Sequence, residues 1–590
     1  MMTGIMADSR EIREIGIEFE SKGSTRKVFL KNNSSEPAFP GSINLRMPEI
    51  FVKETETVHV QPETMCGIIG SQPAADGLRS YGCIGFPATG QTSARLIGVL
   101  DLRTVTAWVE LSRTARGLNP VLVFDLDGTE LAPGEKRCLS DVAVFEGESL
   151  SALFEQYGQV SGCVMDARIP EEPVFGWCSW YYYYGQETER DILRNAQELR
   201  ETGILPPGSV IQIDDGWNRQ EDDALRNWGD WMPGRKFFRG MKSVADDIHS
   251  LEFKAGIWLA PFSVDAASRL AQSHPDWLLN PAEGSLLETG GNPVCGLDLT
   301  HPGVLEFIDE TFDRVFNEWG FDYVKLDFLH HSMTGGNRYD QSVTRTEALH
   351  RALLRIRRIA GDDRFILCCG CPFGPAVGVA DAMRIGFDVG SRWHAPMLTE
   401  LWPNGNCSIK PAAYPSIYCQ WMNGRWWLND PDCLVVRDRP NRFEPLEFNE
   451  DHPGGAVSRD AFGLDDEEAG CWARLVYAVG TFYILSEVWN ELPQLRKELA
   501  RQAIQPAPSR FQDVDTDDER VLMMCSEDGK SFAVFNLSDE AAAPPLPSKW
   551  IPGLYSEVFS GESLSVEPAD RQLPEMLPHS GRVWTRKQIL

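Results

Sequence analysis

The sequence predicts a central (β/α)8 TIM barrel with an antiparallel β-sandwich before it and a small β-sandwich domain after it. Three observations indicate this α/β fold class. The chain has 590 residues, which is too long for one ordinary domain. Its first and last parts alternate apolar and polar residues with a period of two between turn residues. Its middle part alternates strand-like runs with helical runs.

Residues 1–168 are predicted to form the N-terminal β-sandwich. Short segments in which apolar and polar residues alternate are separated there by Gly, Asn and Pro, as in antiparallel strands that bury one face. The segments are 24–32, 56–63, 94–101, 105–112, 119–128 and 138–147.

Residues 169–498 are predicted to form the barrel, because the pattern changes near residue 174. Helical stretches cover residues 188–203, 301–320 and 342–361, and the last two end on Gly, which is a common helix stop. A last helix is expected over 474–487. The eight expected strands are 174–180, 209–215, 253–260, 294–300, 322–328, 364–370, 382–388 and 425–432.

Residues 499–590 are predicted to form the C-terminal β domain. They contain four short strand-like segments bounded by turn residues. These segments are 520–528, 530–539, 554–562 and 582–589.

Charge and composition exclude several function classes. The net charge of −30 and the pI near 4.8 argue against nucleic acid or an anionic membrane as a partner, because both would be repelled. The first twenty residues lack a basic start followed by an apolar run, and no apolar run approaches the roughly 18–20 residues of a membrane span. Fourteen cysteines are scattered without the density of a disulfide scaffold. We therefore expect a cytoplasmic protein.

Charged residues end most of the expected barrel strands, where barrel enzymes carry their functional groups. Any one of them could be a structural cap or a core ion pair, but buried charges need partners, so a converging set indicates a site. The residues are Asp214, Asp215, Asp298, Lys325, Asp327, Cys368, Cys369, Cys371, Arg384, Asp388, Asp430 and Asp432, with Trp177, Trp180 and Trp258 on the first and third strands.

These residue types suit a neutral sugar. Carboxylates accept hydrogen bonds from vicinal hydroxyls, and an indole face covers the apolar side of a sugar ring. Two carboxylates on facing strands suffice for glycoside hydrolysis. Lys325 and Asp327 alternate along one expected strand and therefore share one of its faces.

Other chemistries fit less well. The chain has ten histidines, and His330 and His331 are adjacent, so they point to opposite sides of an extended chain. The cysteines at 368–371 have no second Cys pair or His at ligand spacing, so we expect no metal. No Gly-rich phosphate loop follows a strand and no Gly-x-Ser-x-Gly motif occurs, so we also expect no organic cofactor.

Taken in order, the strand ends resemble glycoside hydrolase family 36, the melibiase-type α-galactosidases. The flanking β domains also fit that family's three-domain layout. The segments that carry the resemblance are FGWCSWYYYY (175–184), VIQIDDGW (210–217), GIWLAPF (256–262), HPDWLL (274–279), DYVKLDF (322–328), CGCPFGPAVGVADAMRIGFD (369–388) and WWLNDPDCLVVR (426–437).

The resemblance implies roles for individual residues. Asp327 matches the family's nucleophile and Asp388 its acid/base. Asp214 and Asp215 resemble the residues that hold the galactose 4- and 6-hydroxyls. The other matching sugar contacts are Lys325, Cys369 and Arg384 around the ring, and Trp177, Trp180 and Trp258 in the aromatic wall.

The resemblance also implies a reaction: exo-acting hydrolysis of terminal α-galactosides with retention, by double displacement through a glycosyl-aspartate ester. Such a mechanism predicts that the carboxyl groups of Asp327 and Asp388 lie roughly 5–5.5 Å apart. Lys325 would help to keep Asp327 ionised, as a nucleophile must be.

Three alternatives stay open at the level of the sequence. Residues 368–372 read CCGCP where many family members have CSGGG, next to the sugar 2-substituent. This difference leaves the choice between galactose and N-acetylgalactosamine open, so an α-N-acetylgalactosaminidase is one alternative. A raffinose-type α-galactosyl transglycosylase on the same site is another. A non-catalytic sugar-binding protein would lack a catalytic carboxylate, and both are present. The linkage, the aglycone and the oligomeric state are not predicted.

Overall fold

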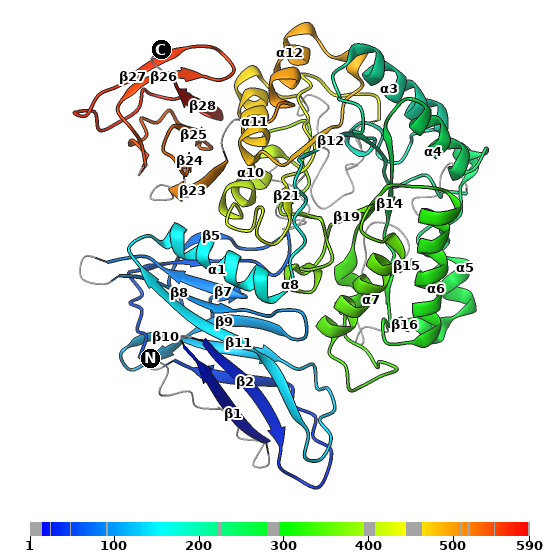
Figure 1. Cartoon of the computed structure of the whole chain (residues 1–590), viewed down its shortest axis with the longest axis vertical. Coiled ribbons are helices and arrows are strands. Elements are labelled where there is room, and N and C mark those ends of the chain that lie inside the picture. The colour runs from blue at the N-terminus through cyan, green and yellow to red at the C-terminus, as the bar shows by residue number, and fades with distance from the viewer. Residues whose placement is uncertain are drawn as a thin grey trace, which may run out of the picture.

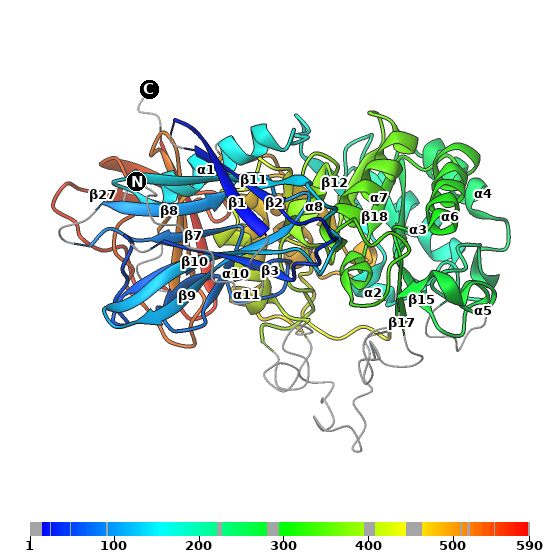
Figure 2. The ribbon, with the colours of Figure 1, turned by 90° about the horizontal axis from the view of Figure 1, so that it is seen from below.

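The computed structural model of the chain shows a barrel with two β domains on one side of it (Figures 1 and 2). The predicted fold class is confirmed. The described residues are 15–587 without 24, 48, 90–92, 221–226, 280–293, 395–406, 444–462, 508–509, 516–519 and 548. Most of the N-terminal segment that bears on a secretion signal, residues 1–14, therefore lies outside the described part.

The N-terminal domain consists of two antiparallel sheets. Along β9 (Thr106–Thr114) every second residue from Ala107 to Leu111 is buried, so one face of the sheet packs inward and the other faces out. The first sheet contains, in spatial order, β1 (Ile15–Lys22), β2 (Thr25–Asn32), β11 (Lys136–Gly147), β8 (Ala94–Val99), β7 (Cys83–Phe86), β4 (Thr57–Val60) and β5 (Gly70–Pro73). The second contains β3 (Ser42–Arg46), β10 (Gly117–Asp125), β9 and β6 (Arg79–Tyr81).

The barrel is built from parallel strands whose side chains are almost all buried. Its two end strands, β21 and β22, are joined by a parallel bridge between Leu434 and Leu485, which nearly closes the sheet. In spatial order the strands are β21 (Leu428–Asp430), β20 (Ala382–Arg384), β19 (Phe365–Cys368), β18 (Tyr323–Leu326), β14 (Lys254–Leu259), β13 (Val210–Ile213), β12 (Val174–Cys178) and β22 (Phe482–Leu485).

One expected barrel strand is wrong. Residues 294–297 form β17, but β17 pairs antiparallel with β15 (Ser263–Asp265) and β16 (Leu278–Leu279) in a separate small sheet. Asp298 accordingly accepts the backbone N–H groups of Thr300 and Tyr339 and holds a turn instead of a barrel position. The alternation of residues predicts a strand but not which neighbour it pairs with.

The missing barrel strand is β22, and the helix predicted over residues 474–487 is therefore wrong in its second half. Gly480, with φ 77°, ends α11 (Asp466–Val479), and the chain then continues as β22. The end of α11, residues 475–479, and β22 are both apolar and fully buried, so periodicity does not separate them.

Helices surround the barrel and begin and end where the sequence provides caps. Thr188 and Asp191 form a capping box at the start of α3, and Gly203 ends that helix in the left-handed region. The long helices are α3 (Glu189–Thr202), α4 (Met241–Ser250), α6 (Pro302–Asp313), α7 (Arg345–Ala360), α10 (Ile409–Tyr418), α11 and α12 (Gln494–Ala503), and the short ones are α2 (Trp180–Tyr183), α5 (Arg269–Ser273) and α8 (Phe373–Ala376). No helix in the described part of the chain is both long and apolar enough to cross a bilayer.

The C-terminal domain contains one six-stranded antiparallel sheet with both faces covered. Leu522 and Met524 on one face join the core of the barrel, whereas Met523 and Cys525 on the other face belong to a separate apolar cluster. The strands, in spatial order, are β23 (Phe511–Asp515), β24 (Val521–Ser526), β25 (Ser531–Asn536), β28 (Ser580–Arg586), β26 (Gly553–Glu557) and β27 (Ser563–Val566).

Partly buried ion pairs connect both β domains to the barrel. Arg345, at the start of α7, donates from its backbone N and its Nε to the carboxylate of Asp127, which follows β10, at 2.8 and 2.6 Å. Arg474 on α11 donates to Glu557 at the end of β26 at 2.8 Å, and it lowers the pKa of Glu557 although burial opposes this shift.

Candidate active site

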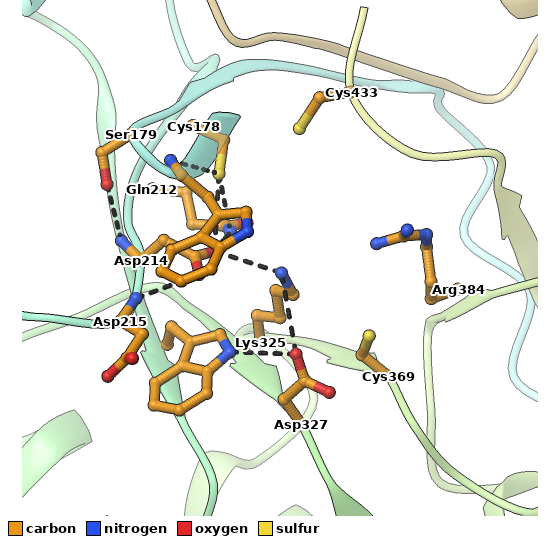
Figure 3. A network of polar contacts seen from close by, with 12 residues as sticks. Cys178, Ser179, Gln212, Asp214, Asp215, Lys325, Asp327, Cys369, Arg384 and Cys433 are labelled. Atoms are coloured by element: carbon orange, nitrogen blue, oxygen red, sulfur yellow. Dashed lines mark hydrogen bonds and ion pairs between the residues drawn. The ribbon is translucent and has the colours of Figure 1, made fainter. Parts of the chain in front are cut away.

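Side chains from the carboxyl ends of several barrel strands converge on one region (Figure 3). Asp214 follows β13, Lys325 lies on β18 and Asp327 follows it, Cys369 follows β19, and Arg384 ends β20. This is the end of a barrel where catalytic groups are found. The separate sequence segments that predicted a site are thus close together in space.

Lys325 is the charged centre of this region. Its Nζ lies 3.1 Å from Asp214 Oδ2 and 3.8 Å from Asp327 Oδ2. Burial alone would lower the pKa of Lys325, but the charges of Asp214 and Asp327 outweigh it and raise the pKa well above its usual value. Lys325 is therefore a permanent cation that joins two carboxylates.

Both carboxylate oxygens of Asp327 accept hydrogen bonds. Trp258 Nε1 donates to Oδ2 at 3.1 Å, and the backbone N–H of Phe328 donates to Oδ1 at 2.7 Å. Phe328 adopts φ 51°, a left-handed conformation that is uncommon for a bulky residue. This sharp turn directly after β18 lets the backbone of the next residue reach the Asp327 carboxylate.

The paired aspartates after β13 have different partners. Asp214 Oδ2 accepts from Lys325 and, at 2.6 Å, from Gln212 Nε2. Asp215 accepts from Arg219 Nη2 at 3.0 Å and from Trp228 Nε1 at 3.3 Å. Burial raises the pKa of Asp215, and Arg219 opposes that shift.

Asp388 lies four residues beyond β20, with 43% of its side chain exposed. Arg384 Nη2 donates to Asp388 Oδ1 at 2.9 Å. Arg384 itself is almost fully buried. Asp388 is thus a solvent-accessible carboxyl group that forms an ion pair with a buried arginine.

Cys369 is buried near both Asp327 and Asp388. Burial raises the pKa of its thiol well above the usual value, and the charge of Asp327 and, more weakly, that of Asp388 add to this effect. The Cys371 thiol instead donates to the carbonyl of Pro372 at 3.1 Å. Cys369, not Cys371, therefore faces the site.

The N-terminal domain contributes to the same region, which the sequence did not predict. The Sδ atom of Met65, between β4 and β5, lies 3.8 Å from Cys369 Sγ and accepts the N–H of Gly370 at 3.4 Å. Burial raises the pKa of the neighbouring Cys66 thiol to about 12, with a contribution from the charge of Asp388. No feature of residues 56–69 signals this contact, because it depends on how the domains dock.

The structure does not bring Trp177 to the site. Its Nε1 donates to the carbonyl of Glu487 at 2.9 Å, and its ring packs edge-on against Tyr183. Its neighbour Cys178 points the other way, toward Asp214. Trp180, at the start of α2, is only partly buried.

We therefore expect Trp258→Phe and Trp177→Phe to differ. Losing the Trp258 hydrogen bond to Asp327 should lower kcat/KM about 10- to 100-fold, the range for a hydrogen bond to a charged group. Trp177→Phe makes the same change outside the site and should leave kcat/KM within about twofold of the parent value. The check is steady-state kinetics on an aryl α-galactoside for both variants. Equal losses in the two would contradict the placement of these rings.

Other residues of the site were not predicted. Tyr181 lies within the run YYYY, and its hydroxyl contacts Asp388 Oδ1 at 3.1 Å. Asp432 is one of the charged residues at the predicted strand ends, but the family resemblance assigns it no catalytic or binding role. The signal available for both was their position directly after barrel strands, but four consecutive tyrosines do not reveal which one points inward.

No group of three or more His, Cys, Asp or Glu side chains within the described ranges is arranged to hold a metal ion. The groups present are carboxylates, one lysine, one arginine, a thiol and indoles. Carboxylates held by cations and N–H donors can attack a carbon centre or move protons. Paired carboxylates at the strand ends of a (β/α)8 barrel are the groups that the glycoside hydrolase class of enzymes uses.

Comparisons with known proteins agree with this class. Residues 159–363 match the family model described as Melibiase. The α-galactosidase AgaA of Geobacillus stearothermophilus is 29% identical over 255 residues, which cover 42% of this chain and 33% of the relative. The α-galactosidase of Escherichia coli is 28% identical over 217 residues, 35% of this chain and 30% of the relative.

Solved structures share the fold over most of the chain. A family 36 AgaA variant in complex with stachyose gives a TM-score of 0.65 at 18% identity, over 97% of this chain and 80% of that one. TtGalA, the α-galactosidase of Thermus thermophilus, in complex with p-nitrophenyl α-D-galactopyranoside gives 0.60 at 22% identity, over 86% and 98%. At these identities the likeness shows the fold.

The chain is thus similar to the melibiase family over residues 159–363 and to α-galactosidases over a comparable part of its length. Its sequence match to the curated relatives named above spans about a third of their length. Which reaction the chain performs is a separate question.

Proposed function

We propose that the chain is a retaining, exo-acting α-galactosidase that releases terminal α-linked galactose from oligosaccharides. The observation that carries this proposal is the pair of carboxyl groups, Asp327 and Asp388, whose charges both act on the buried Cys369. Asp327 is held by Lys325, Trp258 and a backbone N–H, and Asp388 is held by Arg384. The named relatives that match this chain are α-galactosidases.

In the first step, a carboxylate oxygen of Asp327 attacks the anomeric carbon while the glycosidic C–O bond breaks. Asp388 gives its proton to the leaving oxygen at the same time. The exposure of Asp388 supports this role, because a leaving oligosaccharide must reach it from solvent. The product of this step is a galactosyl ester of Asp327.

In the second step, Asp388 takes a proton from water, whose oxygen attacks the anomeric carbon. The ester C–O bond breaks, and Asp327 leaves as a carboxylate. The N–H groups of Trp258 and Phe328 stabilise this carboxylate as it forms again. The separation of roughly 5–5.5 Å between the two carboxyl groups stays a prediction of this mechanism.

Asp214, Lys325 and Asp215 are proposed to hold the galactose hydroxyls. Asp214 shares its Oδ2 with Lys325 and Gln212, so its position is fixed before the sugar arrives. Met65, which comes from the N-terminal domain, contacts Cys369 of the barrel and thereby narrows the site. A location in a reducing cytoplasm is part of the proposal and rests on the scattered cysteines.

A substrate panel tests the proposed function. Nitrophenyl α-galactoside, its 2-acetamido analogue, the β-galactoside and raffinose should be compared under the same conditions. We expect hydrolysis of the α-galactoside and raffinose, and much slower turnover of the other two. Preference for the acetamido sugar would indicate an α-N-acetylgalactosaminidase, and galactosyl products longer than raffinose would indicate a transglycosylase. Binding without turnover of any of them would contradict the assignment of an enzyme.

A further inference from the structure

A buried carboxyl group, Asp432, contacts the same arginine as Asp388 and has no role in the reaction described above. Asp432 is 2% exposed and follows β21 with φ 95°, a conformation that side chains rarely adopt. Its Oδ2 accepts the N–H of Val389 at 2.9 Å, and its Oδ1 accepts the N–H of Cys433 at 2.7 Å. Two backbone N–H groups, one on each carboxylate oxygen, thus hold the Asp432 side chain in place despite its strained backbone conformation.

One guanidinium group serves both carboxyl groups. Arg384 Nη2 contacts Asp388 Oδ1 at 2.9 Å and also forms an ion pair with Asp432 Oδ2. Arg384 carries one positive charge, so this group of three side chains is neutral when one of the two carboxyl groups holds a proton and the other does not.

The Tyr181 hydroxyl bridges the same two carboxyl groups. It lies 3.1 Å from Asp388 Oδ1 and 2.5 Å from Asp432 Oδ2. A hydroxyl group has one proton, so it can donate to only one of them at a time. Burial raises the pKa of Tyr181 well above its usual value, so the hydroxyl keeps this proton.

We propose that Asp432 and Tyr181 are positioning residues for Asp388. While Asp388 holds its proton, the Tyr181 hydroxyl donates to Asp432. Once Asp388 has given its proton to the leaving oxygen, the hydroxyl turns to Asp388 Oδ1 and stabilises the new carboxylate. When Asp388 takes a proton from water, the hydroxyl turns back. No atom is transferred, because only the O–H bond of Tyr181 rotates.

The charges around Asp432 fit this arrangement. Burial raises the pKa of Asp432 to about 7; Arg384 on β20 lowers it, whereas Asp388 and Asp430 raise it further, and Lys325 on β18 lowers it. Tyr181 on α2 faces it as a neutral hydroxyl. Asp432 is thus close to the balance between charged and neutral near neutral pH, so it responds to the charge of Asp388.

The kinetic test compares two neighbouring tyrosines, and this part rests on the proposed function. Tyr181→Phe removes the bridging hydroxyl, whereas Tyr182→Phe removes one that contacts Glu491 outside the site. We expect Tyr181→Phe to lower kcat on raffinose about 10- to 100-fold with KM within about twofold. The loss on a nitrophenyl α-galactoside should be smaller, because nitrophenolate leaves without a proton. Equal kinetics for the two variants, both folded, would overturn the proposal.

A second test needs no substrate. Burial raises the pKa of Asp432 to about 7 in the folded protein, above its ordinary value of about 3.9 in the unfolded chain. The parent therefore loses stability as the pH rises between those values, and Asp432→Asn does not. We expect the Tm of Asp432→Asn minus that of the parent to increase from pH 5 to pH 8.

The same measurement in an Asp388→Asn background shows whether the two carboxyl groups are coupled. Without the charge of Asp388, Asp432 should ionise at lower pH, so the increase in the Tm difference should move to lower pH. An unchanged pH dependence would overturn the proposal even if the enzyme is active. Failure of the substrate panel alone would refute the proposed function and leave this coupling measurable.

Discussion

Asp327→Ala is expected to lower kcat on α-galactosides by roughly 10^4- to 10^6-fold, the range found when a catalytic nucleophile is removed. Without Asp327 no galactosyl ester can form, and the water that replaces the side chain is a weak nucleophile. Trp258 and Lys325 keep other partners in the fold, since Lys325 still pairs with Asp214. The protein should therefore remain folded and should still bind galactose.

Azide tests the geometry of this variant. A small anion can enter the space left by Asp327 and attack the anomeric carbon directly, from the side opposite the leaving group. We expect sodium azide to restore turnover of nitrophenyl α-galactoside and to give β-galactosyl azide, detected by NMR. The control is Asp322→Ala, because Asp322 lies at the opposite end of β18, half exposed and paired with His249. Its kinetics should match the parent; full activity in Asp327→Ala would refute the assignment of the nucleophile.

Asp388→Ala is expected to produce the second-largest effect, and its size should depend on the leaving group. General acid catalysis is worth about 10^2- to 10^4-fold. Raffinose needs that proton, so its kcat/KM should fall by this amount. Nitrophenyl α-galactoside should form the ester at nearly the parental rate, and hydrolysis of the ester should become the slow step.

Azide should act differently on Asp388→Ala. Because the galactosyl ester of Asp327 still forms, azide attacks from the face that the leaving group has vacated and gives α-galactosyl azide. Opposite azide anomers from the Asp327 and Asp388 variants would assign the two roles separately. Equal losses on raffinose and on the aryl substrate, with no effect of azide, would contradict the role of Asp388 as acid/base.

The barrel could largely be predicted from the sequence because its strands are short, buried and followed by polar residues. The alternation of Lys325 and Asp327 predicted that both side chains share one face of the strand. In the structure Lys325 Nζ lies 3.8 Å from Asp327 Oδ2 and 3.1 Å from Asp214 Oδ2. Strand pairing was harder to predict. Residues 294–297 have the pattern of a strand, but they pair antiparallel outside the barrel. Residues 482–485 form a barrel strand, but their apolar sequence follows that of the preceding helix with no change that marks where the helix ends.

The parts of the site that the sequence missed depend on tertiary structure. Met65 reaches Cys369 only because the N-terminal domain docks on the barrel. Asp432 reaches Arg384 because its backbone turns through φ 95°, which no residue pattern encodes. Trp177 was expected beside the sugar, yet its strand turns it toward Tyr183. A shift of one residue along a strand moves a side chain to the other face.

The anomeric form of the first-released sugar tests the central claim most directly. Proton NMR during the first minutes of hydrolysis, before mutarotation equilibrates the product, resolves α- from β-galactose. A double displacement through Asp327 predicts that α-galactose appears first and β-galactose follows at the rate of mutarotation. Initial release of β-galactose would mean a single displacement by water and would contradict the assignment of Asp327 as nucleophile.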